Sequence, residues 1–250
     1  MTDKEQCVLD LINSKQTASI SVIRDAFGYS ESTVRRILNR LSNRGRILRY
    51  HGGGHSVNYQ SPASSVQSRF ELRPQEKDRI ARAAVSQFYS GDTVVLLGGT
   101  TVANMCRYMR GMRITVITNS LLVFDELRSK PETQIILLGG QYNLEEMETR
   151  GALTHSNLKM LRANCLFMGT SQFHPDFGFT TTDINTVELY HLCLEASRKK
   201  FILADSSKFG ESASAVIAGC DMIDCLITDK ELPPAICKEF ITRGVEVLAV

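Results

Sequence analysis

Short apolar runs alternate with helical patterns from Gln75 to the end, and this alternation limits the fold more than any other feature of the chain. The runs that we predict as strands are 93–97, 114–118, 134–138, 165–169, 201–205, 225–229 and 245–250. The patterns that we predict as helices lie near 75–89, 101–110, 120–129, 184–198 and 233–243. Strands that alternate with helices form βα units and a mainly parallel sheet. We therefore predict an α/β domain over residues 75–250.

The first 60 residues have a different pattern, which predicts three short helices and a strand pair. Apolar residues at helical spacing mark the inner faces of the first two helices: Val8, Leu11 and Ile12 in one, and Val22, Ile23 and Phe27 in the other. Ser21 is predicted to cap the second helix and Gly28 to end it. We expect a small domain over residues 1–57, joined to the α/β domain by a polar, Ser-rich linker over 58–74.

A third predicted helix has an apolar stripe on one face and polar residues on the opposite face. Ser30 is its predicted cap, and the stripe consists of Val34, Leu38 and Leu41, with Ile37 beside them. The polar face presents Ser32, Thr33, Arg35, Arg36, Asn39 and Arg40. Gly45 is predicted to close the helix, and a hairpin with a flexible glycine tip at 52–54 follows it.

Arginine is concentrated around this third helix. Residues 30–55 contain six arginines, no lysine and one acidic residue, Glu31. Residues 1–60 contain nine Lys and Arg against five Asp and Glu, whereas the remainder contains 20 against 22. A guanidinium group can hold a phosphate or a guanine edge through two parallel hydrogen bonds. We therefore predict a winged helix-turn-helix that binds double-stranded DNA, with Arg46, Arg49 and His51 of the wing on the phosphate backbone or in a minor groove.

Polar turns follow several of the predicted strands. The turn Gly98, Gly99, Thr100 and Thr101 lies between a strand and a helix, where glycines allow a close approach and a helix start offers free N–H groups. Carboxyl ends of parallel strands meet at one edge of a sheet, where open α/β folds bind ligands. Asp205 could accept hydrogen bonds from sugar hydroxyls there, and Lys208 could pair with a phosphate. We expect a small anionic, hydroxylated ligand.

Both parts of the chain resemble the DeoR family of bacterial transcriptional regulators. The N-terminal match covers about residues 4–55 and includes S-x-x-T-V-R-R and L-x-x-L-x-x-x-G-x-x-x-R-x-H-G-G. The match over 75–250 includes E-K-x-R-I-A, the GGTT turn, L-G-G, D-S-S-K-F-G and the final V-E-V. The resemblance implies a sensor domain similar to ribose-5-phosphate isomerase, which binds phosphorylated sugars or their derivatives. The effector positions that it implies are Gly98, Gly99, Thr100, Thr101, Thr118, Asn119, Gly151, Asp205 and Lys208.

Two positions depart from the family pattern. Most relatives have an aspartate after the paired arginines, where this chain has Ile37, and we expect a change in packing. Relatives usually have E-x-x-x-K in the helix near 184–198. Here Glu188 is present, whereas Tyr190 occupies the position of the lysine. The loss of that cation predicts a ligand with less charge, or one that is held by His191.

These features predict a DNA-binding transcriptional regulator, a repressor in the usual manner of the family, whose operator binding is modulated by a phosphorylated sugar. Paired operator half-sites require a homo-oligomer, a dimer or a tetramer. The alternative is a sugar-phosphate isomerase with an added DNA-binding domain. Isomerisation needs a general base, and the segment 169–178 offers only Asp176. We therefore predict no catalytic residue and no enzyme.

Other candidate features predict little chemistry. The seven cysteines have no paired spacing, and no apolar run approaches about 20 residues, so we expect a cytoplasmic protein with free thiols that does not enter a membrane. The acidic run of Glu145, Glu146 and Glu148 is interpreted as a solvated surface loop. The histidines lack the spacing of a zinc site, and we expect neither a metal nor a cofactor.

Overall fold

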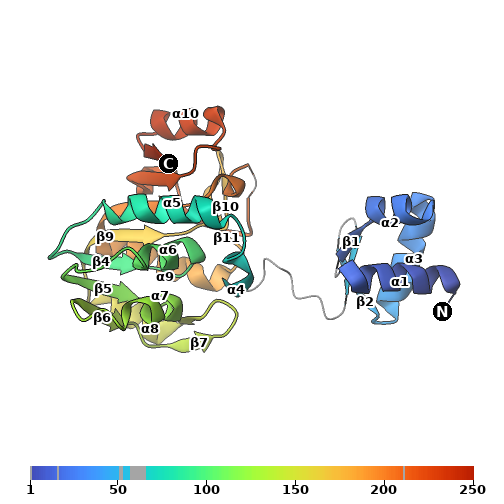
Figure 1. Ribbon diagram of the computed structural model, residues 1–250, viewed down its shortest axis with the longest axis horizontal. Coiled ribbons are helices and arrows are strands. Elements are labelled where there is room, and N and C mark those ends of the chain that lie inside the picture. The colour runs from blue at the N-terminus through green and yellow to red at the C-terminus, as the bar shows by residue number, and fades with distance from the viewer. Residues whose placement is uncertain (1, 16, 51–52, 57–65, 211) are drawn as a thin grey trace. The chain divides into compact units, whose positions relative to one another are not determined.

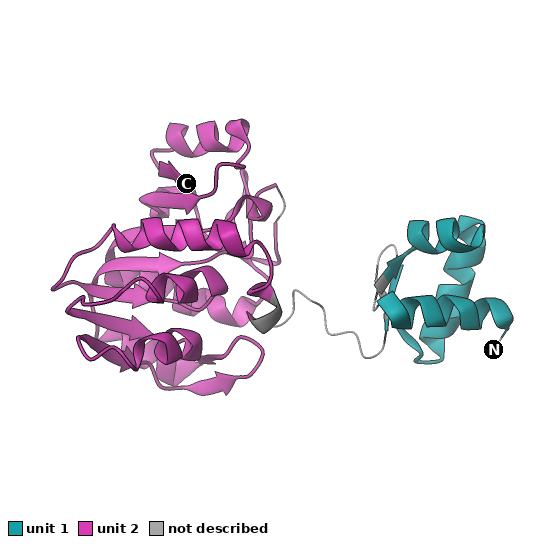
Figure 2. Cartoon of the chain, viewed as in Figure 1, with its two compact units in different colours: residues 1–62 teal, residues 63–250 magenta. Residues whose placement is uncertain are grey.

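The structure is a computed structural model, which describes residues 2–15, 17–50, 53–56, 66–210 and 212–250. The chain divides into two compact units, residues 1–62 and residues 63–250, which are coloured separately in Figure 2. Each unit has its own hydrophobic core among the described residues.

The first unit combines three helices with a small antiparallel sheet. Its elements are α1 (Asp3–Lys15), β1 (Thr17–Ser19), α2 (Ile20–Phe27), α3 (Glu31–Asn43), β2 (Ile47–Tyr50) and β3 (Gly53–Ser56), and the strand order is β1-β3-β2. The inner faces of the helices form one core, made of Val8, Leu9, Ile12, Ile20, Ile23, Val34, Ile37, Leu38, Leu41 and Ile47 with Ala18. This is the arrangement of a winged helix-turn-helix, with α3 as its third helix.

The prediction for α2 was wrong in its start and in one inward residue. Ser19, not Ser21, caps the helix, and its Oγ accepts a hydrogen bond from the Val22 N–H at 3.2 Å. Because the helix begins earlier than predicted, Ile20 and Ile23 face the core, whereas Val22 is 38% exposed. Gly28 ends the helix in the left-handed conformation, as expected.

The prediction for α3 is confirmed. Ser30 Oγ accepts from the Thr33 N–H at 3.3 Å, and Ile37 is buried beside Val34. Gly45 has φ of 64°, and the bonds from Gly45 N to Ser42 O and from Arg46 N to Leu41 O complete a Schellman ending.

The glycine tip of the wing was assigned wrongly in part, because Gly53 and Gly54 belong to β3. A Cβ at Gly54 would lie 3.0 Å from Ile47 Cδ1, so glycine lets β3 lie directly on the core.

The second unit is an α/β domain around a seven-stranded parallel sheet. The strand order is β15-β14-β12-β9-β4-β5-β6, and the pairs are parallel throughout. These strands are β4 (Thr93–Leu96), β5 (Ile114–Thr118), β6 (Thr133–Leu137), β9 (Ala163–Met168), β12 (Ser197–Leu203), β14 (Cys225–Thr228) and β15 (Glu246–Ala249). They correspond one to one to the seven predicted strands. The predicted fold class is thereby confirmed.

Helices cover both faces of this sheet (Figure 1). They are α4 (Val66–Arg69), α5 (Pro74–Val85), α6 (Thr100–Cys106), α7 (Leu121–Leu127), α8 (Ala152–Lys159), α9 (Val187–Ala196) and α10 (Pro234–Thr242), with 3-10 turns η1 (Ile184–Thr186), η2 (Ser206–Lys208) and η3 (Cys220–Met222). The short helix α4 lies within the range that was expected to be a linker, and residues 58–65 of that range lie outside the described part of the chain.

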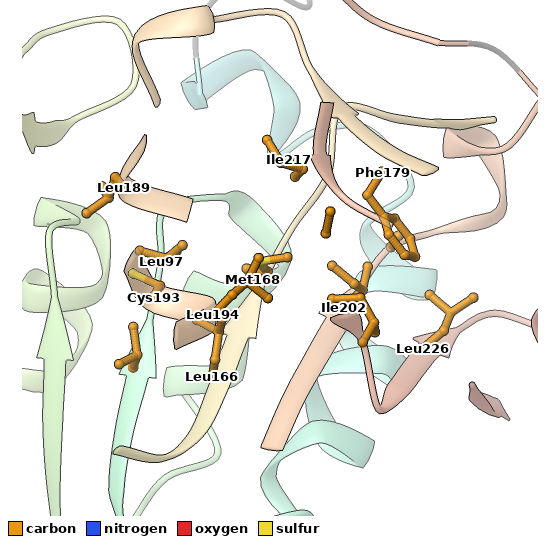
Figure 3. Packing of buried hydrophobic residues seen from close by; sticks show 14 of the residues in the cluster. Leu97, Leu166, Met168, Phe179, Leu189, Cys193, Leu194, Ile202, Ile217 and Leu226 are labelled. Atoms are coloured by element: carbon orange, nitrogen blue, oxygen red, sulfur yellow. The ribbon is translucent and has the colours of Figure 1, made fainter. Parts of the chain in front are cut away.

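Alternate residues of the central strands enter two separate cores. Val94 and Leu96 of β4 contact the core under α5, α6 and α7, whereas Val95 joins the core that includes α8, α9 and α10. Figure 3 shows the latter core, in which Leu97 lies beside Cys193 of α9. Continuous burial on both faces explains why the strands are apolar runs rather than alternating patterns.

Two antiparallel additions were not predicted from the sequence. The hairpin of β7 (Gln141–Asn143) and β8 (Glu148–Arg150) follows β6, and a small sheet joins β10 (Gln172–His174), β11 (Gly178–Thr181) and β13 (Ala215–Ala218). No helix in the described residues is long and apolar enough to cross a membrane. The same residues contain no cluster of His, Cys, Asp and Glu suited to a metal ion.

Candidate functional site

The polar face of α3 is a candidate DNA interface. Of the six residues predicted to read bases, Ser32, Arg35, Arg36, Asn39 and Arg40 are exposed, whereas Thr33 is half-buried. Arg35 forms an ion pair with Glu31 at 2.7 Å, one helical turn away. Within the described part of the chain Arg36 forms no ion pair, which leaves its guanidinium available for DNA.

Glu5 of α1 holds the C-terminal end of α3. Its side chain is buried, and its two carboxylate oxygens lie 3.4 Å from Arg40 Nη1 and 3.1 Å from Arg44 Nη1. The hydrogen bond from the Thr2 N–H, with the two arginines, holds the pKa of Glu5 below its usual range. Sequence reasoning missed this acid. Arg40 therefore has a structural partner in addition to its predicted place on the DNA-reading face.

The wing residues are only partly described. Arg46 is exposed directly after the end of α3, and Arg49 lies on β2. His51 lies outside the described residues.

The glycine-threonine turn after β4 has the close-approach geometry that the sequence predicted. Gly99 has φ of 127°, a backbone conformation that residues other than glycine rarely adopt. Thr100 and Thr101 are 6% and 8% exposed, and neither hydroxyl bonds to another described residue. We call residues 98–101 the glycine turn.

A carboxylate that sequence reasoning had placed in solvent lies against this turn. Glu148 is 8% exposed, and its Oε2 accepts a hydrogen bond from Asn119 Nδ2 at 3.2 Å. An ideal Cβ at Gly98 would lie 2.7 Å from the same Oε2 atom. The interpretation of this acidic run as a solvated loop was therefore wrong for Glu148, because the hairpin β7–β8 folds it onto the sheet edge.

Burial changes the proton affinity of Glu148. Loss of solvation, with the nearby carboxylate of Glu146, raises the pKa of Glu148 to about 7, against an opposing effect of the Asn119 hydrogen bond. A residue that titrates near neutrality in a functional region is a candidate for ligand recognition.

Two predicted effector residues have structural partners that account for their polar groups. The Thr118 hydroxyl donates to Leu96 O at 2.7 Å and accepts from Ser120 N at 3.0 Å. The Asp205 carboxylate accepts hydrogen bonds from the Ser207 N–H and hydroxyl. Both side chains are buried and hydrogen-bonded within the protein, so no bound ligand is needed to satisfy their polar groups.

Three cations, Arg73, Lys77 and Lys208, gather around Asp205. Arg73 Nε lies 3.9 Å from Asp205 Oδ1, and Lys208 lies close enough to Lys77 to lower the pKa of Lys77. Lys77 is 4% exposed and donates to the Arg69 carbonyl. Burial lowers the pKa of Lys77 to about 8, although Asp205 opposes this change.

A cavity of about 600 Å³ lies beside Gly151, and no other predicted effector residue lines it. Its walls are Gln141, Tyr142, Asn143, Arg150, Gly151, His155, Ile184, Asn185 and Glu188. The Arg150–Asp183 ion pair, at 2.6 Å, joins β8 to the segment before η1. Among the predicted residues, Asn119 and Gly98 both border Glu148, Asp205 and Lys208 lie near Lys77, and Gly151 lines the cavity.

Comparison with known families identifies both units. A DeoR-like helix-turn-helix domain matches residues 5–60, and the DeoR C terminal sensor domain matches residues 72–230. The chain belongs to the DeoR family. It is a DNA-binding transcriptional regulator with a sensor domain.

Relatives within the DeoR family match the chain over nearly its full length. The HTH-type transcriptional regulator UlaR of Shigella sonnei (strain Ss046) is 29% identical, over 99% of this chain and 98% of its own. GolR of Listeria innocua serovar 6a is 26% identical over 98% and 97%, and the uncharacterized regulator YulB of Bacillus subtilis (strain 168) is 28% identical over 100% and 97%. These relatives are regulators, not enzymes, in agreement with the prediction that this chain is not an enzyme.

Solved structures share parts of the fold at low similarity. Ribose 5-phosphate isomerase A of Methanocaldococcus jannaschii is 14% identical, with a TM-score of 0.39 over 54% of this chain and 53% of its own. The eIF2B beta subunit of Chaetomium thermophilum is 17% identical, with a TM-score of 0.45 over 61% and 48%.

The helix α9 clarifies the departure from the family's E-x-x-x-K pattern. An E-x-x-x-K pattern that begins at Glu188 has its last position at Leu192, not at Tyr190, so Tyr190 was assigned wrongly to the position of the lysine. Burial, with the nearby carboxylates of Glu148 and Glu146, raises the pKa of Tyr190, so the phenol stays neutral. Glu188 instead lies 3.2 Å from His155 Nδ1.

Proposed function

We propose that this DeoR-family regulator is a repressor, and that a phosphorylated sugar or sugar derivative that binds at the glycine turn changes its affinity for an operator. The observation that carries the proposal is the turn itself. Gly98 and Gly99 allow close approach, and the hydroxyls of Thr100 and Thr101 have no partner among the described residues. Backbone N–H groups and free hydroxyls of this kind suit phosphate oxygens.

A short helix offers a route from this site toward the DNA-binding unit. Helix α4 is the first described element after residues 57–65, and its Val66 N–H donates to Glu145 O at 3.0 Å. Arg69 of α4 forms a bidentate pair with Glu146, and Lys77 holds the Arg69 carbonyl. Glu146 lies two residues before Glu148, so a ligand at the glycine turn would act on the hairpin that fixes α4.

The proposed regulation has a thermodynamic requirement. The ligand must bind one arrangement of the protein better than another, because equal affinity for both would leave operator binding unchanged. We propose a homo-oligomer, at least a dimer, in which two α3 helices contact successive half-sites of a palindromic operator. A ligand that moved α4 would alter the spacing of those helices.

The proposal is tested with operator DNA selected by the full chain from a random library. Footprints on that DNA are recorded with and without a panel of sugar phosphates, and thermal stability is followed with the same panel. We expect at least one sugar phosphate both to raise the melting temperature and to weaken the footprint. Thr100→Val should remove the response to the ligand while it leaves the footprint intact. A panel that leaves both the footprint and the melting temperature of the wild type unchanged would contradict the proposed effector.

A further inference from the structure

Glu148 is a buried acid that forms no ion pair with a basic side chain of the described residues. Arg69 is paired with Glu146, and Arg150 is paired with Asp183 at 2.6 Å. Among the described residues no lysine or arginine forms an ion pair with Glu148. The Glu148 carboxylate accepts a hydrogen bond from the neutral amide of Asn119, which does not compensate a full negative charge.

The position of the carboxylate relates it to the glycine turn. Because a Cβ at Gly98 would lie 2.7 Å from Oε2 of Glu148, the absence of a side chain at Gly98 is what makes room for the acid. A ligand that occupies the glycine turn therefore meets this carboxylate.

Further unpartnered polar atoms lie next to Glu148. Ser120 pairs with Glu148 through an isolated antiparallel bridge, and its buried hydroxyl has no hydrogen-bond partner. The Oδ1 atom of Asn119 is also buried and has none. A carboxylate and an amide oxygen only accept hydrogen bonds, whereas the Ser120 hydroxyl can donate one, so the acceptor atoms in this corner of the domain outnumber the donors.

We propose that Glu148 is a specificity-determining residue of the effector site, and that it selects a ligand that presents an amino or hydroxyl group to its carboxylate. The inference rests on the proposed function, because the ligand reaches Glu148 only if it binds at the glycine turn. An anionic group of the ligand must then lie away from Gly98, toward Thr100 and Thr101. An amino group and a hydroxyl group of the ligand can both donate a hydrogen bond to the carboxylate. The experiment distinguishes between these two donors.

The test uses hexose 6-phosphates in matched sets, in which carbon 2 or carbon 3 carries an amino group, a hydroxyl group or hydrogen. Dissociation constants are measured by calorimetry at pH 8 for the full-length wild type, Glu148→Gln and the matched control Glu145→Gln, whose side chain is exposed. In at least one set, we expect the wild type to bind the member with a donor about tenfold more tightly than the deoxy member.

The variants show whether the ligand donates through an amino group or through a hydroxyl group. Glu148→Gln keeps the size of the side chain and one acceptor oxygen, so a preference for the amino sugar should fall about tenfold, whereas a preference for the hydroxyl should fall less. Glu145→Gln should bind as the wild type does. Operator footprints of the ligand-free variants show whether each variant is folded, and a misfolded Glu148→Gln would be replaced by Glu148→Ala in the same comparison.

Failure of the inference and failure of the proposed function give different results. If Glu148→Gln and Glu148→Ala bind every compound within about twofold of the wild type, while Thr100→Val weakens binding, the effector site stands and the role of Glu148 is refuted. If the wild type binds no member of the panel, the proposed sugar-phosphate effector is refuted and this inference with it. A wild type that prefers the deoxy members also refutes the inference.

Discussion

Glu148 and Asn119 meet at the carboxyl end of β5, where the Oε2 atom of the acid lies 3.2 Å from Nδ2 of the amide. The hairpin β7–β8 brings the acid there from 29 residues further along the chain. An acid that is buried against a neutral amide ionises at a cost in free energy, and that cost can be measured.

The stability of the protein should depend on the ionisation of Glu148. Its pKa is raised from 4.5 to about 7, so between these values the folded state keeps a proton that the unfolded state has released. The free energy of unfolding should therefore fall by about 1.4 kcal/mol per pH unit as the pH rises through this window. Urea unfolding should show that the free energy of unfolding of Glu148→Gln lacks this pH-dependent fall and that Glu145→Gln keeps it. The same slope in Glu148→Gln and the wild type would disprove the assignment.

Lys77 should produce the opposite dependence in another window. Burial lowers its pKa from 10.5 to about 8, so between these values the unfolded state binds the additional proton. The free energy of unfolding should rise by about 1.4 kcal/mol per pH unit from pH 8 upward, until other groups titrate. Unfolding of Lys77→Met, measured between pH 7.5 and about 9.5, should lack this rise. Lys159→Met, at an exposed position, serves as the control and should retain it.

Gly98→Ala should lower stability through Glu148. The new Cβ would lie 2.7 Å from Oε2, and the buried carboxylate has little room to move. We expect a loss of about 1 to 3 kcal/mol in the free energy of unfolding. Most of this loss should be absent when Gly98→Ala is made in a Glu148→Ala background, as a double-mutant cycle would show. Additive effects would mean that the two residues do not interact.

Arg36 should contribute to operator affinity more than Arg35 does. Arg35 is paired with Glu31, whereas Arg36 is exposed and has no ion pair among the described residues. Loss of one bidentate contact to a base costs about 1 to 3 kcal/mol, so Arg36→Ala should weaken operator binding about tenfold or more in gel-shift titrations, and Arg35→Ala should weaken it less. Arg198→Ala makes the same change in net charge on an exposed strand position of the second unit and should have little effect. Equal losses of operator affinity in Arg36→Ala and Arg198→Ala would indicate only a nonspecific effect of charge.

The pair between Arg69 and Glu146 should couple the effector to the operator. Glu146→Gln removes the charge that holds Arg69 of α4. Because Glu146 also raises the pKa of Glu148, the comparison is made at pH 8, above that pKa in both proteins. We expect the variant to bind the effector with nearly the affinity of the wild type in calorimetry. Its footprint should respond to the effector much less. A normal response would show that the signal takes another path.

The parallel sheet was predictable because its central strands are buried on both faces and are therefore apolar runs that the sequence shows directly. The caps of α3 were also local signals, since Ser30 and Gly45 act on neighbouring backbone groups. The start of α2 was missed because Ser19 and Ser21 are both able to cap a helix, and only the burial of Ile20 decides between them.

The candidate site was less predictable than the sheet. The family resemblance pointed to the glycine turn and Asn119, but nothing local distinguishes Glu148 from the exposed Glu145. Its burial depends on how the hairpin β7–β8 folds back, and that is a long-range property. The sequence also suggested that Asp205 and Lys208 lie at the ligand site, and this stays a prediction. The structure adds Arg73, Lys77 and Ser207 as neighbours of Asp205, and no local sequence signal indicated them.

The hairpin β7–β8 forms a two-stranded sheet of its own and contributes no strand to the seven-stranded ladder. Substitutions along it can change which chemical groups border the glycine turn without removing a hydrogen bond of that ladder. Ligand preference in such a domain can therefore diversify during evolution while the sheet that supports it is conserved.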